Sequence, residues 1–215
     1  MSRGVLLIVL SMACIGASIP LGDSMMIKLP VWLFTFMTIF MALVILIPLS
    51  ILKEKTQWLK LGLKNYLGMF MQALLTATLY TVFTLYGIIH ASAITVGIVS
   101  SITPAVVLVL SFFLLNEKLN LKKISSIILA VVAVLIMNLV GIQDNGGSSP
   151  LGMVYMLLAV LSISLFFIYA KKFSVELPPF TLAAGLALFG TLQTLPMAIV
   201  EFNSKDMAVF SSGMI

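Results

Sequence analysis

The sequence predicts an all-α protein, a polytopic transmembrane helix bundle of seven spans. Hydrophobic residues make up 61% of the chain and charged residues only 9%, whereas soluble domains contain roughly 25% charged residues. Crossing a hydrocarbon core takes about 20 helical residues, and seven uncharged apolar runs approach or exceed that length. They cover residues 4–21, 29–52, 66–89, 92–115, 124–142, 151–170 and 179–200. Because the runs are continuous, they exclude the alternating strands of a β-barrel.

The third and fourth runs require a turn between them. Residues 66–116 contain no Asp, Glu, Lys or Arg, and as one helix this stretch would be roughly 75 Å long at 1.5 Å per residue. It must therefore fold back within the membrane region. His90-Ala91-Ser92 is the polar break near its middle, and we expect the turn there.

The basic residues predict the orientation. With the N-terminus in the cytoplasm, ten basic residues fall on the cytoplasmic side and only Lys28 and Lys205 fall outside, a strong positive-inside bias for short loops. The ten are Arg3, Lys53, Lys55, Lys60, Lys64, Lys118, Lys122, Lys123, Lys171 and Lys172. The net charge of +5 is thus explained by contacts with the lipid bilayer, and no nucleic-acid partner is expected. The sequence predicts a multi-pass plasma-membrane protein, and its excess of Lys over Arg hints at a bacterial source.

A repeat organises the chain. When the sequence is shifted by 148 positions along itself, Gly4 meets Gly152, Pro30 meets Pro178 and Pro48 meets Pro196. Because five spans, an odd number, separate the two starts, the second copy enters the membrane from the opposite face. Inverted repeats of this kind are common in secondary transporters, whose substrate site lies near the midplane between the halves. Chance alignment of two apolar stretches that contain proline is the alternative.

The repeat defines the expected domains. Residues 1–145 form a first repeat of five transmembrane helices, residues 151–202 an incomplete second repeat of two, and residues 203–215 an outer tail. Two full copies would need a chain twice as long as the shift between them, which is longer than this sequence. The last three helices of the architecture are therefore expected to be missing after Ile215.

The membrane runs hold no groups for catalysis. None of them contains Asp, Glu, Lys or Arg, and the chain has a single His. Zinc hydrolysis, paired-carboxylate catalysis and Ser-His catalysis all lack their residues. We therefore expect no enzyme activity, no metal site and no cofactor.

The third run carries a polar stripe. Gln72, Thr76, Tyr80 and Thr84 follow one another at four-residue spacing, which places them near one helical face. Lipid cannot satisfy these groups, so the face should turn inward. It either lines a solute path or forms hydrogen bonds between helices, and the sequence leaves both interpretations open.

The fourth run carries a proline in its middle. Pro104 lacks a backbone N–H, so it frees the carbonyl of Ser100 and bends the helix. That carbonyl, beside Ser101, could bind a polar solute, or the proline could be a static kink. Gly16 and Pro20 in the first run allow the same two interpretations.

Three further side chains complete the candidates. Ser162 and Ser164 lie in the first helix of the second repeat and are possible lining residues. Glu117, beside Lys118, either forms a gating salt bridge with a cytoplasmic lysine or is a solvated loop charge, which contributes about 1 kcal/mol or less.

The residues 92–137 resemble the fourth and fifth helices of the EamA-type family of the drug/metabolite transporter superfamily. The resemblance is carried by Thr103-Pro104 and by Asn116-Glu117-Lys118-Leu119; Gly16–Pro20 and Leu157–Phe173 resemble the end of the family's first helix and the opening of its second repeat. Ser126, Ala133 and Ile163 depart from the pattern, and the eighth to tenth helices are absent. The resemblance implies a ten-span-type solute carrier.

The predicted function is a membrane solute carrier that exports a small metabolite or amino acid by alternating access. The uncharged lining favours neutral or zwitterionic solutes. The alternative is a truncated chain without transport activity of its own, or a half-transporter that needs a partner chain. The expected partners are the bilayer, a small solute, and either a second copy in a homodimer or a complementing chain.

Overall fold

The computed structural model describes residues 4–6, 9–11, 13–14, 16–17, 29–91, 93–116, 124–125, 128–129, 132, 136, 149–172 and 177–212. All regular elements among these residues are helices, which confirms the all-α prediction. Within them, five helices are long and apolar enough to span a membrane: Val31–Glu54, Leu63–His90, Thr95–Leu115, Pro150–Lys172 and Pro179–Asn203. The first predicted run is described only in fragments and the fifth lies mostly outside the described residues, so five of the seven expected spans are seen.

Helix α2 (Val31–Glu54) has clear boundaries. Pro30 precedes it and carries no side-chain oxygen that could cap the free N–H groups of the first turn. At the other end Lys55 adopts a left-handed conformation (φ 52°) and its N–H bonds the Ile51 carbonyl. The Thr56 N–H bonds the Ser50 carbonyl at 3.3 Å. The left-handed Lys55, bonded four residues back to Ile51, is an αL C-cap, which stops the helix.

The next membrane-length helix contains a π-helical segment. After the short 3₁₀ turn η1 (Trp58–Lys60), it comprises α3 (Leu63–Ala73), the π-helical η2 (Leu74–Tyr80) and α4 (Thr81–His90). The Thr81 hydroxyl donates to the Thr76 carbonyl, five residues back, at 3.2 Å. Helix α4 ends at His90 and Ala91 is extended, so the predicted turn is confirmed.

The helix that follows the turn is broken in its middle. Helix α5 (Ala93–Ser100) and α6 (Thr103–Leu115) are separated by Ser101 and Ile102, just before Pro104. The predicted bend is therefore present, because Pro104 has no N–H to continue the helical hydrogen bonds and its ring clashes with the carbonyl four residues back. Asn116, left-handed at φ 52°, ends α6.

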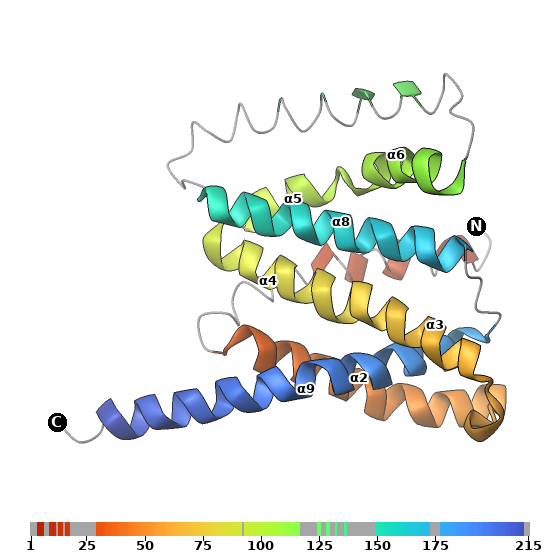
Figure 1. The fold of residues 1–215 in the computed structure, drawn as a ribbon, viewed down its shortest axis with the longest axis horizontal. Coiled ribbons are helices and arrows are strands. Elements are labelled where there is room, and N and C mark those ends of the chain that lie inside the picture. Colours follow the sequence, from red (N-terminus) through yellow and green to blue (C-terminus); the bar gives the residue numbers. More distant parts are fainter. Residues whose placement is uncertain are drawn as a thin grey trace.

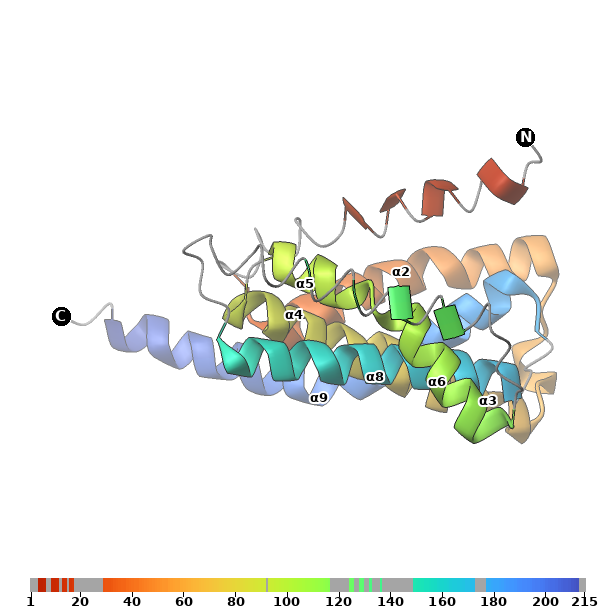
Figure 2. The same cartoon turned by 90° about the horizontal axis from the view of Figure 1, so that it is seen from above.

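The last two described helices are α8 (Pro150–Lys172) and α9 (Pro179–Ser212). Residues 203–212, within the expected outer tail, are helical and continue α9 beyond the membrane-length span. The physical reason is that no Gly or Pro occurs between positions 197 and 212 to stop the helix. The last turns of α9 project beyond the other helices (Figures 1 and 2).

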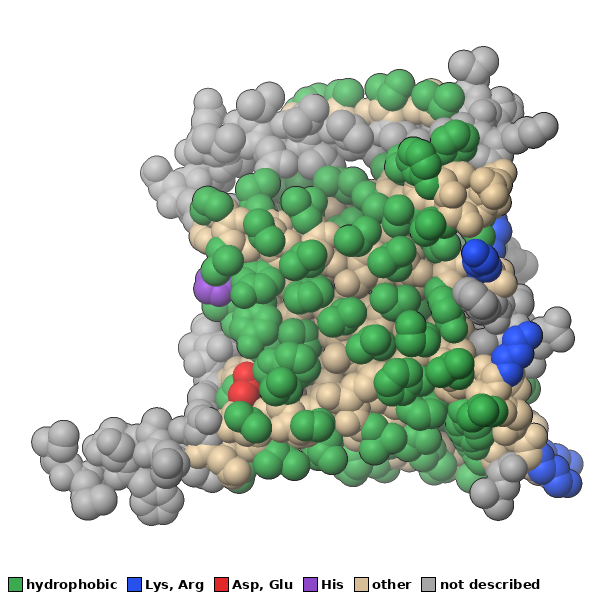
Figure 3. Space-filling view, in the orientation of Figure 1, with side chains coloured by type: hydrophobic (Ala, Val, Ile, Leu, Met, Phe, Trp, Pro, Cys, Tyr) green, Lys and Arg blue, Asp and Glu red, His purple; other side chains and the backbone are tan. Residues whose placement is uncertain are grey.

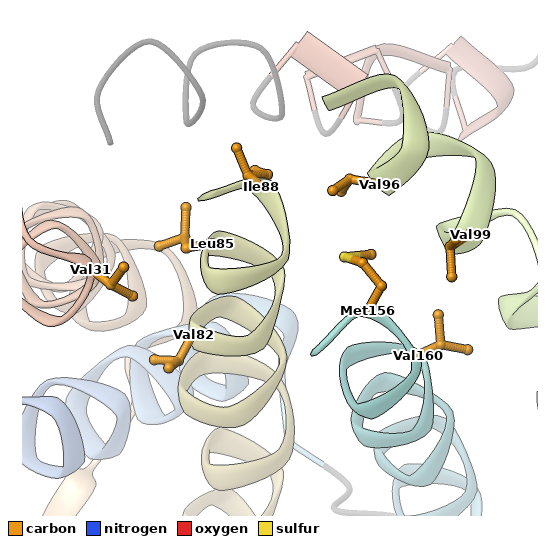
Figure 4. Close-up of a cluster of buried hydrophobic side chains, with 8 residues drawn as sticks. All are labelled: Val31, Val82, Leu85, Ile88, Val96, Val99, Met156 and Val160. Carbon is orange, nitrogen blue, oxygen red and sulfur yellow. The ribbon is translucent and has the colours of Figure 1, made fainter. Parts of the chain in front are cut away.

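The described helices pack side by side with their axes roughly aligned (Figure 1). Helix α9 packs along α2 and also contacts α3, while α8 packs against α4, η2 and α6. A buried apolar cluster joins α4 and α5 to α8 and to the start of α2 (Figure 4); it consists of Val31, Val82, Leu85, Ile88, Val96, Val99, Met156 and Val160. The core therefore connects helices from both predicted repeats.

The outer surface is apolar and its charges lie at the ends. Figure 3 shows a face covered with hydrophobic side chains, with lysines at one edge and His90 at the other. Leu63 is 84% exposed and Leu52 76% exposed, as expected for side chains that face lipid. We call the two ends of the bundle the lysine end, where α2 and α8 end, and the histidine end, where α4 ends.

Candidate functional site

Helices α2 and α9 lie antiparallel and begin in the same way. The Phe34 N–H bonds the Pro30 carbonyl at 2.9 Å, and the Leu182 N–H bonds the Pro178 carbonyl at 2.9 Å. Both members of the second pair lie 148 positions after their counterparts in the first. The two Leu-Pro sequences therefore start equivalent helices.

A glutamate at the end of α2 binds the start of α9. At the lysine end, Glu54 Oε1 accepts a hydrogen bond from the Phe180 N–H at 2.9 Å. Its Oε2 accepts from both the N–H and the hydroxyl of Thr181, each at 2.7 Å. The carboxylate thus satisfies N–H groups that have no partner within their own helix and interacts with the positive end of the helix dipole.

A second glutamate does the reverse at the histidine end. Glu201, in α9, accepts hydrogen bonds from the N–H groups of Trp32 at 2.9 Å and Leu33 at 3.2 Å. Trp32 and Leu33 lie 148 positions before the two residues that Glu54 binds. We call these two arrangements the carboxylate clasps. They were missed from the sequence, although each glutamate follows a Leu-Pro sequence by about the length of one membrane-spanning helix, a spacing that could have revealed them.

A polar link joins the π-helical segment to α9. The Thr78 hydroxyl donates to Gln193 Oε1 at 2.7 Å, and Gln193 Nε2 donates to the Phe70 carbonyl at 3.1 Å. Neither Thr78 nor Gln193 was among the predicted candidates. Thr78 escaped notice because four-residue spacing assumes a regular α-helix, whereas a π-helical turn contains an extra residue.

The π-helical segment also changes the predicted polar stripe. Gln72, only 2% exposed, and Thr84 face the interior, as expected. Thr76 and Tyr80 are only partly buried, and between them Thr78 takes the buried position. The Gln72 Oε1 atom is buried and accepts no hydrogen bond from any residue that the structure describes.

The bend in the fourth predicted span is more closed than expected. The Ser100 carbonyl, which Pro104 leaves free, accepts a hydrogen bond from the Thr103 hydroxyl at 2.7 Å. The Ser101 hydroxyl donates to the Ile98 carbonyl at 2.6 Å and belongs to an exposed residue. Pro104 is also exposed. Of the two interpretations, this bond within the bend favours the static kink; Ser100 Oγ is buried without a described partner.

The serines of α8 differ from each other. Ser162 Oγ donates to the Leu158 carbonyl at 2.8 Å, a bond within the helix. Ser164 is fully buried, and its Oγ has no partner in the described part of the chain. Gly16 is exposed, and a Cβ atom added to it would meet no described atom within 4 Å. Pro20 and Glu117 lie outside the described residues.

Four side chains of the predicted runs thus present buried polar atoms without described partners: Gln72 in α3, Thr84 in α4, Ser100 in α5 and Ser164 in α8. Buried polar groups are normally hydrogen-bonded, so these atoms mark places where water or a polar solute would bind. Within the described residues, no three His, Cys, Asp or Glu side chains lie close enough together to hold a metal ion.

An open cavity of about 210 Å³ lies at the lysine end, apart from these atoms. It is lined by Leu75, Leu114, Leu165, Ile168, Tyr169 and Lys172. None of the predicted site residues lines it. Its apolar walls offer a contact for a hydrocarbon group and no chemistry beyond the Lys172 amine and the Tyr169 hydroxyl.

The comparisons with known proteins agree with this architecture. Residues 2–139 match the EamA-like transporter family, a family of transporters and not of enzymes. The chain is 32% identical over 201 residues to the uncharacterized transporter YetK of Bacillus subtilis (strain 168), an alignment that covers 93% of this chain and 61% of YetK. No solved structure matches the chain. The sequence match and the membrane-length helices together show that the chain belongs to the EamA-like transporter family.

Proposed function

We propose that this chain is a solute carrier of seven spans, which exports a small neutral or zwitterionic metabolite, such as an amino acid, by alternating access. The observation that carries the proposal is the antiparallel α2–α9 pair, whose capping contacts recur in the register of the sequence repeat. Two equivalent helices of opposite direction are what an inverted repeat requires. An inverted repeat lets two halves exchange conformations around a site near the midplane.

The solute would bind through uncharged polar groups. Gln72 and Ser164 are almost fully buried, and each has a side-chain oxygen without a described partner. No Asp, Glu, Lys or Arg lies between residues 66 and 116, so nothing in that stretch favours a net charge on the solute. The lysine end is the cytoplasmic face in this proposal, and the membrane is the plasma membrane of a bacterium.

The test is export from proteoliposomes. Vesicles that contain the purified chain are loaded with a mixture of radiolabelled amino acids, and efflux is followed against empty vesicles. We expect efflux that Gln72→Leu and Ser164→Ala slow at least several-fold while the protein remains folded. Thr38→Val is a matched control, since its hydroxyl bonds carbonyls of its own helix. Efflux equal to that of empty vesicles, or equal in all variants, would contradict the proposed solute class or site.

A second candidate is a chain that transports only together with a partner chain, as a homodimer or with a complementing chain. This chain spans 61% of the length of YetK. Native mass spectrometry of the protein in detergent separates the two candidates. A monomer with efflux supports transport by one chain; a dimer or mixed assembly whose dissociation abolishes efflux supports the second candidate.

A further inference from the structure

We propose that the two carboxylate clasps keep α2 and α9 together as one rigid unit in every conformation of the transporter, and that the other described helices move past this unit. The inference rests on the proposed alternating-access function. It goes beyond that function by dividing the bundle into a fixed part and a moving part. Glu54 and Glu201 are positioning residues in this scheme, and they do not touch the solute.

The starts of α2 and α9 depend on each other for hydrogen-bond acceptors. Pro30 offers α2 no side-chain cap, and the N–H groups of Trp32 and Leu33 find their acceptor on α9. The first N–H groups of α9 find theirs on α2. Separating the helices would break hydrogen bonds to charged acceptors at both ends at once, and such bonds are stronger than bonds between neutral groups. Each helix therefore begins correctly only while the other is in place.

Helices α2 and α9 make further contacts besides the two clasps. At the lysine end the hydroxyls of Thr56 and Thr181 are hydrogen-bonded, and the Lys53 amine lies 5.4 Å from the centre of the Phe180 ring, a cation–π contact. In the middle, a methyl group at Gly190 would lie 3.3 Å from Ile39 Cγ2. Helices α2 and α9 are thus closely packed at their centre and hydrogen-bonded to each other at both ends.

The irregular elements lie outside α2 and α9 themselves, although η2 is hydrogen-bonded to α9 through Thr78 and Gln193. The π-helical η2 and the broken α5–α6 helix adjoin α8, and the unpartnered polar atoms of Gln72, Ser100 and Ser164 lie on α3, α5 and α8. π-Helical segments are frequent at functional sites. Helices α2 and α9 contain prolines at equivalent positions, Pro48 and Pro196, and continue through them without a break. Movement is therefore expected around η2, α5–α6 and α8.

The rigidity is measured without any transport assay. Spin labels are attached at Leu52→Cys and Met197→Cys in a Cys14→Ala background, since both native side chains are exposed, at 76% and 50%. Met197 lies near the first turns of α2, whereas Leu52 lies near the end of that helix. At 1.5 Å per residue the two labels are therefore about 24 Å apart along the helix axis. Double electron–electron resonance measures distances in this range. A matched pair, Leu52→Cys with Leu157→Cys on α8, reports a helix expected to move.

In lipid nanodiscs we expect one narrow distance for the α2–α9 pair and a broad or double distribution for the α2–α8 pair. Glu54→Gln, Glu201→Gln and the double variant should broaden the first distribution progressively. Two separate α2–α9 distances in the parent protein would overturn the proposal. So would an unchanged distribution in the folded double variant, because the carboxylates would then not hold the pair.

A disulfide cross-link between α2 and α9 tests whether transport continues while the two helices are held together. Thr56→Cys and Thr181→Cys, in the Cys14→Ala background, place two thiols where the native hydroxyls meet. We expect the oxidised protein to keep at least half of the efflux of its reduced form. Loss of efflux on oxidation that returns on reduction would show that the clasp must open, and would overturn the proposal. If the parent protein exports nothing, the proposed function fails, and the distance measurement still decides whether the pair is rigid.

Discussion

Substitution of Gly152 by Ala tests how closely α4 and α8 approach each other. A Cβ atom at Gly152 would lie 2.8 Å from both the carbonyl carbon and oxygen of His90, and 3.0 Å from Ala91 Cβ. The His90 atoms belong to the backbone at the end of α4, and the same carbonyl accepts a hydrogen bond from the Ser149 N–H at 3.1 Å. The methyl group of Gly152→Ala must therefore push the turn at His90 away from the start of α8. The hydrogen bond from the Ser149 N–H to the His90 carbonyl opposes that movement.

The expected loss follows from two opposing effects. Overpacking that shifts backbone costs about 1–3 kcal/mol, while replacing glycine by alanine in a helix gains up to about 1 kcal/mol. We expect a net destabilisation of about 1–2 kcal/mol, which for a chain of this size lowers the melting temperature by about 2–8 °C.

The assay is thermal unfolding of the purified protein in detergent, followed by tryptophan fluorescence. Gly97→Ala is the matched control: a methyl group there meets no described atom within 4 Å, so its melting temperature should stay the same or rise. If Gly152→Ala melts at or above the parent temperature, the described contact between the end of α4 and the start of α8 is wrong.

Three other tests follow from the same structure. Gly87→Ala should lower the melting temperature less than Gly152→Ala does, because its methyl group would meet the flexible Met156 side chain and not backbone; equal losses would contradict this. Thr78→Val and Gln193→Leu should show a coupling of about 0.6 kcal/mol in a double-mutant cycle, the usual value for such bonds in membrane bundles, and strict additivity would exclude the bond. Ser164→Ala should leave thermal stability unchanged or raise it, since the hydroxyl has no described partner; a clear loss of stability would reveal a structural partner.

The parts of the fold that the sequence predicted well depend on strong and simple physical limits. The turn after His90 had to exist because an uncharged stretch of that length cannot be one span, and His90-Ala91-Ser92 offered the polar break. The bend before Pro104 follows from a missing N–H and a steric clash. Both limits act locally, so no knowledge of neighbouring helices was needed.

The parts that it missed depend on contacts between helices. The π-helical segment leaves hydrophobicity unchanged, and it moved Thr78 into the place expected for Thr76. The clasps pair a carboxylate with backbone N–H groups, and backbone donors have no sequence signature. Glu201 was left outside the apolar run of residues 179–200 because charge was taken to end a span, whereas a helix can continue past the membrane.

The register of the clasps bears on the origin of the pair. Chance similarity of two apolar stretches could align their prolines, but it would not make each stretch bind the equivalent two residues of the other. The equivalence is also imperfect, since the position equivalent to Glu201 is Lys53, beside Glu54. Lys53 instead contacts the Phe180 ring, next to the clasp that its neighbour forms. The repeat spacing is therefore kept at the residues whose N–H groups are bound at the start of each helix.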